Sequence, residues 1–310
     1  MPLTLLSISA LAATTYACTR DRDALHRGIA NHSHHDLGHK KRDTGLDPSN
    51  RGRATTPTAT TSAEWVETHL PWLVTNAVAY LNMISQSRIP PLGIGSDYAA
   101  FYYNGVSAID IRSDGGKTDP VYRYHGHYDS YAWMAKFGDP GFKIHHAMGQ
   151  WLSLVAYHIA DDVVIPWDLP SAGRVLRTHY EDLKETVTAA YPDLELDLSP
   201  IDDAIAEFEG AAKRIAAAAK QALAFNNTVL FDVINGMYRD FFRGFASAGG
   251  LPGRPTFHNA ISAPGLDNGY GAVVFPAVQD SLSSGDEEQA RGWVEKSASA
   301  VSRAAEILRI

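Results

Sequence analysis

The stretch Val121–Asp162, VYRYHGHYDSYAWMAKFGDPGFKIHHAMGQWLSLVAYHIADD, joins a loop rich in aromatic residues and histidines to a long amphipathic segment. Asp139 and Pro140 are residue types preferred at the N-cap and first position of a helix, so we expect a helix to begin there. The loop before this helix carries His125 and His127, whose imidazoles can be presented to a metal or a substrate. One apolar helix face is predicted from residues at helical spacing: Ile144, Met148, Trp151, Leu152, Val155 and Ile159.

This stretch resembles the last metal-ligand segment of the glutamate carboxypeptidase II family. The resemblance rests on Tyr124-His125-x-x-Tyr128-Asp129 and on the run from Trp133 to His145. It extends from about Ser62 to the C-terminus and is dense again at Leu251-Pro-x-Arg-Pro255. Members of that family are di-zinc exopeptidases that share their architecture with the transferrin receptor. The resemblance therefore implies a peptidase domain followed by a helical dimerisation domain.

The length and composition of the chain are those of a globular protein. Its 310 residues have room for one large domain or two ordinary ones, and 45% of them are hydrophobic. The formal net charge is -8 and the isoelectric point is near 5.9, so the chain lacks the basic surface typical of nucleic-acid binding. We therefore expect no nucleic acid as a partner.

The N-terminal residues have a different character from the rest. Leu3–Tyr16 is an apolar run too short to span a bilayer, and Thr15-x-Ala17 fits a cleavage signature, so residues 1–17 are predicted to be a signal peptide. No second segment is long and apolar enough to predict a membrane anchor. These features predict entry into the secretory pathway and an extracellular or vacuolar location.

Residues 18–61 are polar and show no sustained periodicity, which predicts an unpacked propeptide or disordered linker. Within this segment, Lys40-Lys41-Arg42 resembles a dibasic processing site. Asn226-Asn227-Thr228 would accept N-glycosylation in the secretory pathway, so we expect a glycoprotein.

Residues 62–170 alternate between helical and strand patterns. Ala63–Leu70 predicts a helix, Ala77–Asn82 a short buried strand, Asp97–Phe101 a short helix and Val106–Ile111 another strand. This order is typical of a mostly parallel sheet with helices. The resemblance identifies the region as the C-terminal part of a zinc-exopeptidase domain, an α/β remnant.

Residues 171–310 show helical patterns almost throughout and predict an all-α four-helix bundle. We expect Ser199 to cap the second helix, Thr228–Phe245 to form the third, and Asp286 to start the fourth. Gly249–Val278 is expected to be an irregular loop, which the family sends back to its active site. The residues expected to face inward are Leu176, Tyr180, Leu183 and Val187 in the first helix, Ile201, Ile205, Phe208, Ala212, Ile215, Ala219 and Ala222 in the second, Val229, Val233, Ile234, Met237 and Phe241 in the third, and Trp293, Ser297, Val301, Ala304 and Leu308 in the fourth.

The resemblance identifies this bundle as a dimerisation domain of the transferrin receptor type. The apolar pattern favours self-association too, because the seam Ile201–Ala222 and the stripe Trp293–Leu308 are expected to exceed what one core can bury beside Phe241, Phe242 and Phe245. A symmetric homodimer through the helical domain would cover the excess.

The resemblance assigns roles to seven residues. His125 matches the last zinc ligand, and Tyr124 matches the tyrosine that hydrogen-bonds the carbonyl oxygen of a peptide substrate. Arg112 matches an arginine that selects acidic side chains. Asn268 and Tyr270 match a loop that grips the substrate carboxylate. Glu64 and Glu67 match ligands of a structural calcium ion.

Four of the seven assignments have an alternative from the residues themselves. Glu64 and Glu67 suit an exposed helix face equally well, Arg112 suits an exposed surface, and Tyr270 suits core packing. His145 and His146 have no motif and are expected on a helix surface or in satisfied packing.

The zinc mechanism needs two metals, a bridging carboxylate and a general-base glutamate. Of the five metal ligands in the family, only His125 stands at a matching position. Thr55-Thr56-Pro57 replaces a Glu-Glu pair and Ile84 replaces an aspartate, and neither hydroxyls nor isoleucine substitute for charged ligands. No catalytic residue is therefore assigned, and the chain is expected to be inactive as written.

Three interpretations remain open. In the first, the chain or a full-length parent is a secreted di-zinc carboxypeptidase. In the second, it is a non-catalytic homologue that dimerises or binds a partner, as in the transferrin receptor. In the third, the gene model has lost exons near Arg53–Thr61 and Arg88, and with them the ligand segments.

Overall fold

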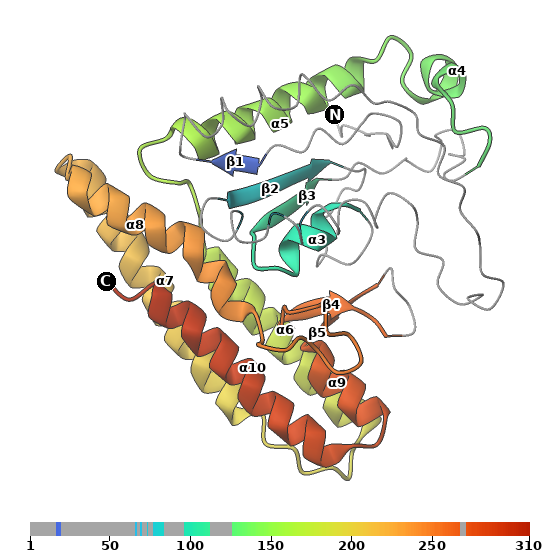
Figure 1. Ribbon diagram of the computed structural model, residues 1–310, viewed down its shortest axis with the longest axis vertical. Coiled ribbons are helices and arrows are strands. Elements are labelled where there is room, and N and C mark those ends of the chain that lie inside the picture. The colour runs from blue at the N-terminus through green and yellow to red at the C-terminus, as the bar shows by residue number, and fades with distance from the viewer. Residues whose placement is uncertain are drawn as a thin grey trace.

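The computed structural model describes residues 17–19, 66, 69, 73, 77–83, 96–111, 126–266 and 271–310. The described part is mostly helical. Figure 1 shows a small sheet with helices on both sides and, below it, an elongated group of helices formed by the C-terminal half. The predicted boundaries at residues 17, 61 and 170 are not tested by this arrangement and stay predictions.

The sheet contains β1 (Ala17–Thr19), β2 (Ala77–Met83) and β3 (Ala108–Ile111), in that order. β2 and β3 run parallel, whereas β1 pairs with β2 in the antiparallel sense. Both strands expected in residues 62–170 are therefore present. β1 was not expected, since it includes residues of the segment predicted to be unpacked. Three short strands do not establish the mostly parallel sheet of a peptidase domain, which stays a prediction.

Two helices cover the sheet. α3 (Tyr98–Tyr102) contacts β2 and β3, as the sequence predicted, and α5 (Lys143–Asp161) contacts β1 and β2 from the other side (Figure 1). Val66, His69 and Leu73 are also helical, with the first and last buried.

α5 begins at Lys143, three residues later than the predicted first position at Pro140. The short helix α4 (Tyr131–Trp133) and a π-helix, η1 (Met134–Gly138), precede it. Gly141 and Phe142 then have φ angles of 81° and 52°, and two successive left-handed residues cannot continue a right-handed helix. Asp139 still caps α5 from outside the helix, because its carboxylate accepts hydrogen bonds from the backbone nitrogens of Ile144 and His145.

The predicted apolar face of α5 is only partly correct. Met148 and Ile159 are buried and Leu152 and Val155 are half-buried, whereas 46% of Trp151 is exposed. Successive residues of a helix are about 100° apart around its axis, so Trp151 lies about 300° from Met148. This position is at the edge of the buried face.

The bundle consists of α6 (Leu169–Ala190), α7 (Ser199–Ala224), α8 (Thr228–Asp240) and α10 (Glu287–Ile307). α7 contacts α6, α8 and α10, so it is the central helix. The four predicted inward residues of α6, the seven of α7 and the five between Trp293 and Leu308 are all buried. Asp286 caps α10, accepting a hydrogen bond from the backbone nitrogen of Gln289 at 2.8 Å.

One bundle core does bury both apolar faces, so our packing argument for a dimer was wrong. The seam of α7 and the stripe of α10 pack against each other, and each therefore covers the other. The turn η2 (Phe241–Phe245) adds its aromatic rings to the same core, with Phe241 and Phe245 buried and Phe242 half-buried.

The third predicted helix ends at Asp240, where the chain tightens into the 3-10 turn η2. Its inward face was predicted only in part, because Ile234 and Phe241 are buried and Met237 packs against the core, whereas the two valines are exposed. Val229 and Val233 are 74% and 44% exposed. The sequence of α8 has two apolar faces, and the one with Phe231, Ile234 and Tyr238 is buried. Aromatic side chains bury more apolar area than valine, which explains why this face of α8 packs against the core and the valine face does not.

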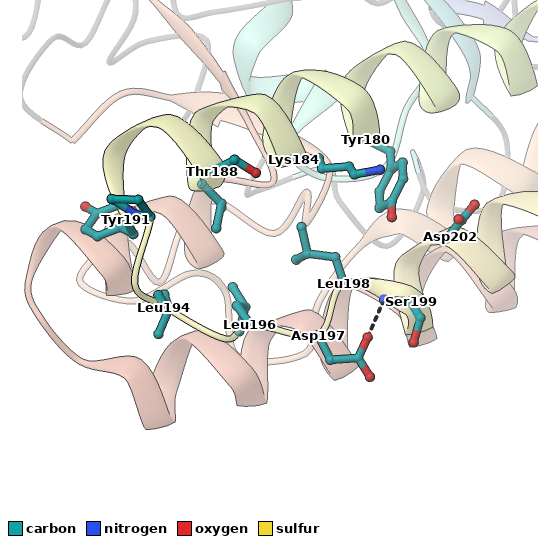
Figure 2. A pocket seen from close by; sticks show the side chains of 12 residues that line it. Tyr180, Lys184, Thr188, Tyr191, Leu194, Leu196, Asp197, Leu198, Ser199 and Asp202 are labelled. Atoms are coloured by element: carbon teal, nitrogen blue, oxygen red, sulfur yellow. Dashed lines mark hydrogen bonds between the residues drawn. The ribbon is translucent and has the colours of Figure 1, made fainter.

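The connection between α6 and α7 packs through alternate leucines (Figure 2). Leu198 is buried and Leu194 and Leu196 are partly buried, as expected for an extended segment beside a core. Ser199 is the first residue of α7 and not its N-cap, which is Leu198. The backbone nitrogen of Ser199 donates to the Asp197 carboxylate at 2.9 Å, a bond drawn in Figure 2. A cleft of about 390 Å³ lies beside this connection, and its described lining holds no group of three His, Cys, Asp or Glu side chains that could bind a metal ion.

The predicted irregular loop Gly249–Val278 contains regular structure. β4 (Ser262–Pro264) and β5 (Ala272–Val274) form a hairpin, and α9 (Pro276–Ser283) follows at once. Arg254 is buried, donates to the carbonyl of Pro264 and pairs with Asp280 of α9. The hydrogen bond ties the loop to the hairpin, and the partly buried ion pair ties it to α9.

Asn235 joins the linker before α6 to α8. It is buried, its side-chain oxygen accepts from the backbone nitrogen of Ile165 at 2.8 Å, and its side-chain nitrogen donates to the carbonyl of Val163 at 2.9 Å. We expect Asn235→Ala to lower the free energy of unfolding by about 2 kcal/mol, because two buried backbone groups lose their partner. Urea denaturation measures this, with Gln221→Ala on the exposed side of α7 as the control. A loss no larger than that of the control would contradict the anchoring role.

Candidate functional site

All seven residues assigned by resemblance lie outside the described residues. These are Glu64, Glu67, Arg112, Tyr124, His125, Asn268 and Tyr270. Their roles therefore stay predictions, and the structure bears on the segments that flank them.

Arg112 directly follows the last residue of β3. β3 is parallel to β2, with Asn82 paired to Asp110 and Met83 to Ile111, so both strands end at the same edge of the sheet. Ligands of open parallel sheets bind beyond the carboxyl ends of the strands. Arg112 thus follows the carboxyl end of β3 in the sequence, and its role in substrate binding stays a prediction. Asp110, which stands where the family has a second arginine, is buried in β3.

The segment after His125 is a tight turn followed by two helical turns. The backbone nitrogen of Asp129 donates to the carbonyl of Gly126 at 3.0 Å, and the hydroxyl of Ser130 accepts from the backbone nitrogen of Trp133 at 3.3 Å. His127 and Tyr128 point to solvent, with 75% of Tyr128 exposed. His127 consequently has no neighbour among the described residues that would make it a ligand.

Asp139 is the polar centre of this region. One of its carboxylate oxygens accepts from the backbone nitrogens of Ile144 and His145, each at 2.9 Å, and lies 2.7 Å from Nδ1 of His145. Burial acts to raise the pKa of Asp139, but the hydrogen bonds from His145 and Ile144 outweigh it and lower the pKa. His145 is thus in satisfied packing and His146 is exposed, as expected.

Replacing Asp139 tests this cap. A carboxylate whose pKa is lowered by folding stabilises the protein above its unfolded pKa of about 4, and this stability is lost as the pH falls through the folded value. Asp139→Asn is therefore expected to cost about 2 kcal/mol at pH 7, with the difference from the unmodified protein shrinking below about pH 4. Denaturant curves at several pH values measure it, and Asp161→Asn, at the far end of the same helix, is the control. A difference that does not depend on pH would contradict the charged cap.

Asn268 and Tyr270 belong to the loop between β4 and β5. The neck of this loop is closed by the backbone nitrogen of Gly265, which donates to the carbonyl of Gly271 at 2.8 Å. The segment before the hairpin contacts the sheet side of the molecule, since the backbone nitrogen of His258 donates to the carbonyl of Tyr103 and Phe257 packs edge-on to the Tyr103 ring. The helical half therefore contacts the end of α3 through the segment before this hairpin.

Within the described part of the chain, no three His, Cys, Asp or Glu side chains gather closely enough to hold a metal ion. In the described part of Val121–Asp162, the closest pair of such side chains is His145 and Asp139. Both belong to the cap of α5. The zinc and calcium sites predicted from the resemblance thus rest on residues that the structure does not describe. None of the described helices is long and apolar enough to cross a membrane.

Known proteins resemble the chain in both halves. The family model of the transferrin receptor-like dimerisation domain matches residues 196–309, which is α7 to α10 of the bundle. A probable glutamate carboxypeptidase of Arthroderma benhamiae is 38% identical over 296 residues, which cover 80% of this chain and 40% of that protein. This chain belongs to the glutamate carboxypeptidase and transferrin receptor-like family.

Two further relatives are less similar to this chain and differ in the activity that their names state. A probable glutamate carboxypeptidase of Arabidopsis thaliana is 33% identical over 193 residues, covering 62% of this chain and 27% of the relative. An inactive zinc metalloprotease of Schizosaccharomyces pombe is 26% identical over 187 residues, covering 57% of this chain and 23% of the relative. The chain spans less than half the length of each of these three relatives. Some members of the family are thus named as inactive.

Proposed function

We propose that this chain is a dimerising member of the family that has little or no peptidase activity as written. The observation that carries the dimer is the match of residues 196–309 to a dimerisation domain, which in the structure are α7 to α10 packed into the common core. The low activity is proposed from the sequence: Thr55-Thr56-Pro57 and Ile84 stand where zinc ligands are expected.

The corner between α7 and α8 is the surface that we propose for the dimer. Four exposed apolar side chains gather there, with exposures of 52% for Leu223, 77% for Phe225, 74% for Val229 and 44% for Val233. Val229 and Val233 are one turn apart on α8, and the whole corner lies inside the matched residues. Pairing of this corner with its copy about a two-fold axis would remove the apolar area from water.

A charge in this corner is expected to separate the protomers. Phe225→Asp should raise the dissociation constant at least tenfold, because a carboxylate would be buried without a partner in the interface. Sedimentation velocity measures the constant, and Leu154→Asp is the control, because Leu154 is an apolar residue of α5 that is 54% exposed and lies outside this corner. Equal effects of the two substitutions would place the interface elsewhere.

The secretory route and the glycan remain part of the proposal. Asn226 is exposed at the same corner, beside Phe225. A glycan there would compete with pairing, so the dimer is measured on protein from bacterial and from secreting eukaryotic cells. N-terminal sequencing of secreted material tests the predicted loss of residues 1–17, and material that begins at Met1 would contradict it.

The alternative function is that of a zinc-dependent carboxypeptidase acting on peptides, in this chain or in a longer parent. The identity to proteins named as probable glutamate carboxypeptidases favours it, as do Tyr124, His125 and Arg112 at matching positions. Two zinc ions per protomer would support this alternative, and their absence would support the proposal above.

A further inference from the structure

The outer face of α5 carries apolar side chains where a solvated helix face usually carries charges. α5 contacts β1 and β2 with one face, and residues at helical spacing on the opposite face are exposed from Lys143 to Asp161. On this outer face, the exposed fractions are 46% for Trp151, 54% for Leu154 and 57% for Tyr157. No Asp, Glu, Lys or Arg occurs in the sequence between Lys143 and Asp161. The centres of protein interfaces are depleted in charge and enriched in Trp and Tyr, so the outer face has the composition of an interface.

Six residues of the outer face form one stripe, which we call the α5 seam. They recur four and three positions apart, the spacing at which helices pack side by side in a coiled coil. The six are Lys143, Ala147, Gln150, Leu154, Tyr157 and Asp161, and all are exposed. A shallow hollow lined by α5 residues alone lies over the middle of this seam, and its lining includes Gln150, Leu154 and Tyr157. The seam is therefore open to a second helix.

The α5 seam is complementary to an antiparallel copy of itself. A two-fold axis at the midpoint of the seam brings together three kinds of pair, each formed twice. They are Lys143 with Asp161, Ala147 with Tyr157, and Gln150 with Leu154. The cation at one end of each helix thus meets an anion, and the small alanine leaves room for the tyrosine ring. The dipoles of antiparallel helices also place the positive end of one helix beside the negative end of the other.

Other arrangements fit the outer face less well. In a parallel pair, Lys143 would face Lys143 and Asp161 would face Asp161. The hydroxyl of Tyr157 donates to the Asp161 carboxylate, which raises the pKa of Tyr157, so the negative charge is held at the seam. Helices that lie on a membrane surface are rich in Lys and Arg on their polar face, whereas the end of α5 carries Asp161 and Asp162. A second copy of this chain is therefore the better occupant.

We propose that the α5 seam is a second self-association surface, which pairs antiparallel with the seam of another copy. It shares no residue with the α7–α8 corner, and the proposal does not rest on the dimer proposed there. Three large apolar side chains are exposed at α5 and four at the corner, so pairing through α5 needs a higher concentration. At micromolar concentration, Leu154→Asp therefore remains a valid control for the corner.

Charge reversal tests the register of this pair. Every protein carries Phe225→Asp to weaken pairing at the corner, and sedimentation equilibrium up to roughly 500 µM measures the dissociation constant. Lys143→Glu and Asp161→Lys are each expected to weaken association about fivefold, because each places like charges together twice in the pair. The double variant restores opposite charges and should return to within about twofold of the parent. Lys184→Glu, the same charge change at an exposed position of α6, is the control and should have no effect.

An apolar substitution site tests the centre of the seam. Leu154→Asp in the same background should abolish association up to roughly 500 µM, because a carboxylate would be buried there without a partner. Circular dichroism first confirms that each variant is folded, and the charge variants keep the test valid if Leu154→Asp is not. A micromolar dimer that persists with Phe225→Asp but is lost with Leu154→Asp would support the α5 seam and contradict the corner.

Three results would overturn the proposal. The first is a monomer throughout this concentration range before any change to α5. The second is a loss of association in the single charge variants that the double variant does not reverse. The third is co-sedimentation with phosphatidylserine vesicles in place of self-association, which would assign the outer face to membranes.

Discussion

Purified chain in zinc-containing buffer is expected to release C-terminal residues from a peptide library at a rate at least a thousandfold below that of an intact di-zinc exopeptidase. The reason is chemical. Without a second metal and a bridging carboxylate no water is polarised, and without the glutamate no group accepts its proton. General acid–base catalysis alone is worth a factor of about 100 to 10,000. Tyr124 and Arg112 could position a peptide but not attack it.

The assay includes metal analysis and one matched comparison. The Arthroderma benhamiae protein, 38% identical to this chain, is purified and assayed in parallel. Two tightly held zinc ions per protomer with turnover that His125→Ala abolishes would contradict the ligand count. In that case other residues of the loop, such as His127 or Asp129, would have replaced the missing ligands.

Gly244→Val is expected to unfold the bundle or to lower its stability by about 3 kcal/mol or more. Gly244 lies in η2 where the chain crosses α10, and a Cβ atom built on it would stand 2.4 Å from the backbone nitrogen of Ala304. Backbone cannot move aside as a flexible side chain does, so η2 and α10 would have to separate. The rings of Phe241 and Phe245 would then lose part of their packing in the core.

A loss of that size corresponds to a fall in the melting temperature of about 6–12 °C. Gly292→Ala is the control, because Gly292 is an exposed residue of α10 with no atom within 4 Å of the added Cβ. It should be neutral or stabilising by up to about 1 kcal/mol. Similar melting temperatures for the two variants would mean that η2 and α10 do not approach as closely as described.

The bundle was largely predictable from the sequence, because three of its helices, α6, α7 and α10, each have one apolar face that the spacing identifies. Ile201 to Ala222 and Trp293 to Leu308 are inside as predicted. α8 was not, since its two apolar faces are equivalent by spacing and only the packing of Phe231 and Tyr238 decides between them. The dimer argument failed for a related reason. A count of apolar residues does not show that two faces of one chain cover each other.

The turn elements were the least predictable. The start of α5 depends on the left-handed Gly141 and Phe142, and phenylalanine gives no signal for that conformation. The hairpin of β4 and β5 consists of three residues per strand, too few for an alternating pattern to be recognised. The polar contacts of Asn235 join segments about 70 residues apart in sequence, and no local pattern encodes such pairs. The candidate site came from the resemblance alone, and its residues are the ones the structure does not describe.

The central claim is that the helical half of this chain makes a symmetric dimer. Sedimentation equilibrium of the full chain from bacterial cells, without glycan, tests it most directly. At micromolar concentration we expect twice the 33.7 kDa of one chain, with a mass that falls toward the monomer for Phe225→Asp. A single species with the mass of one chain throughout the micromolar range would contradict the claim.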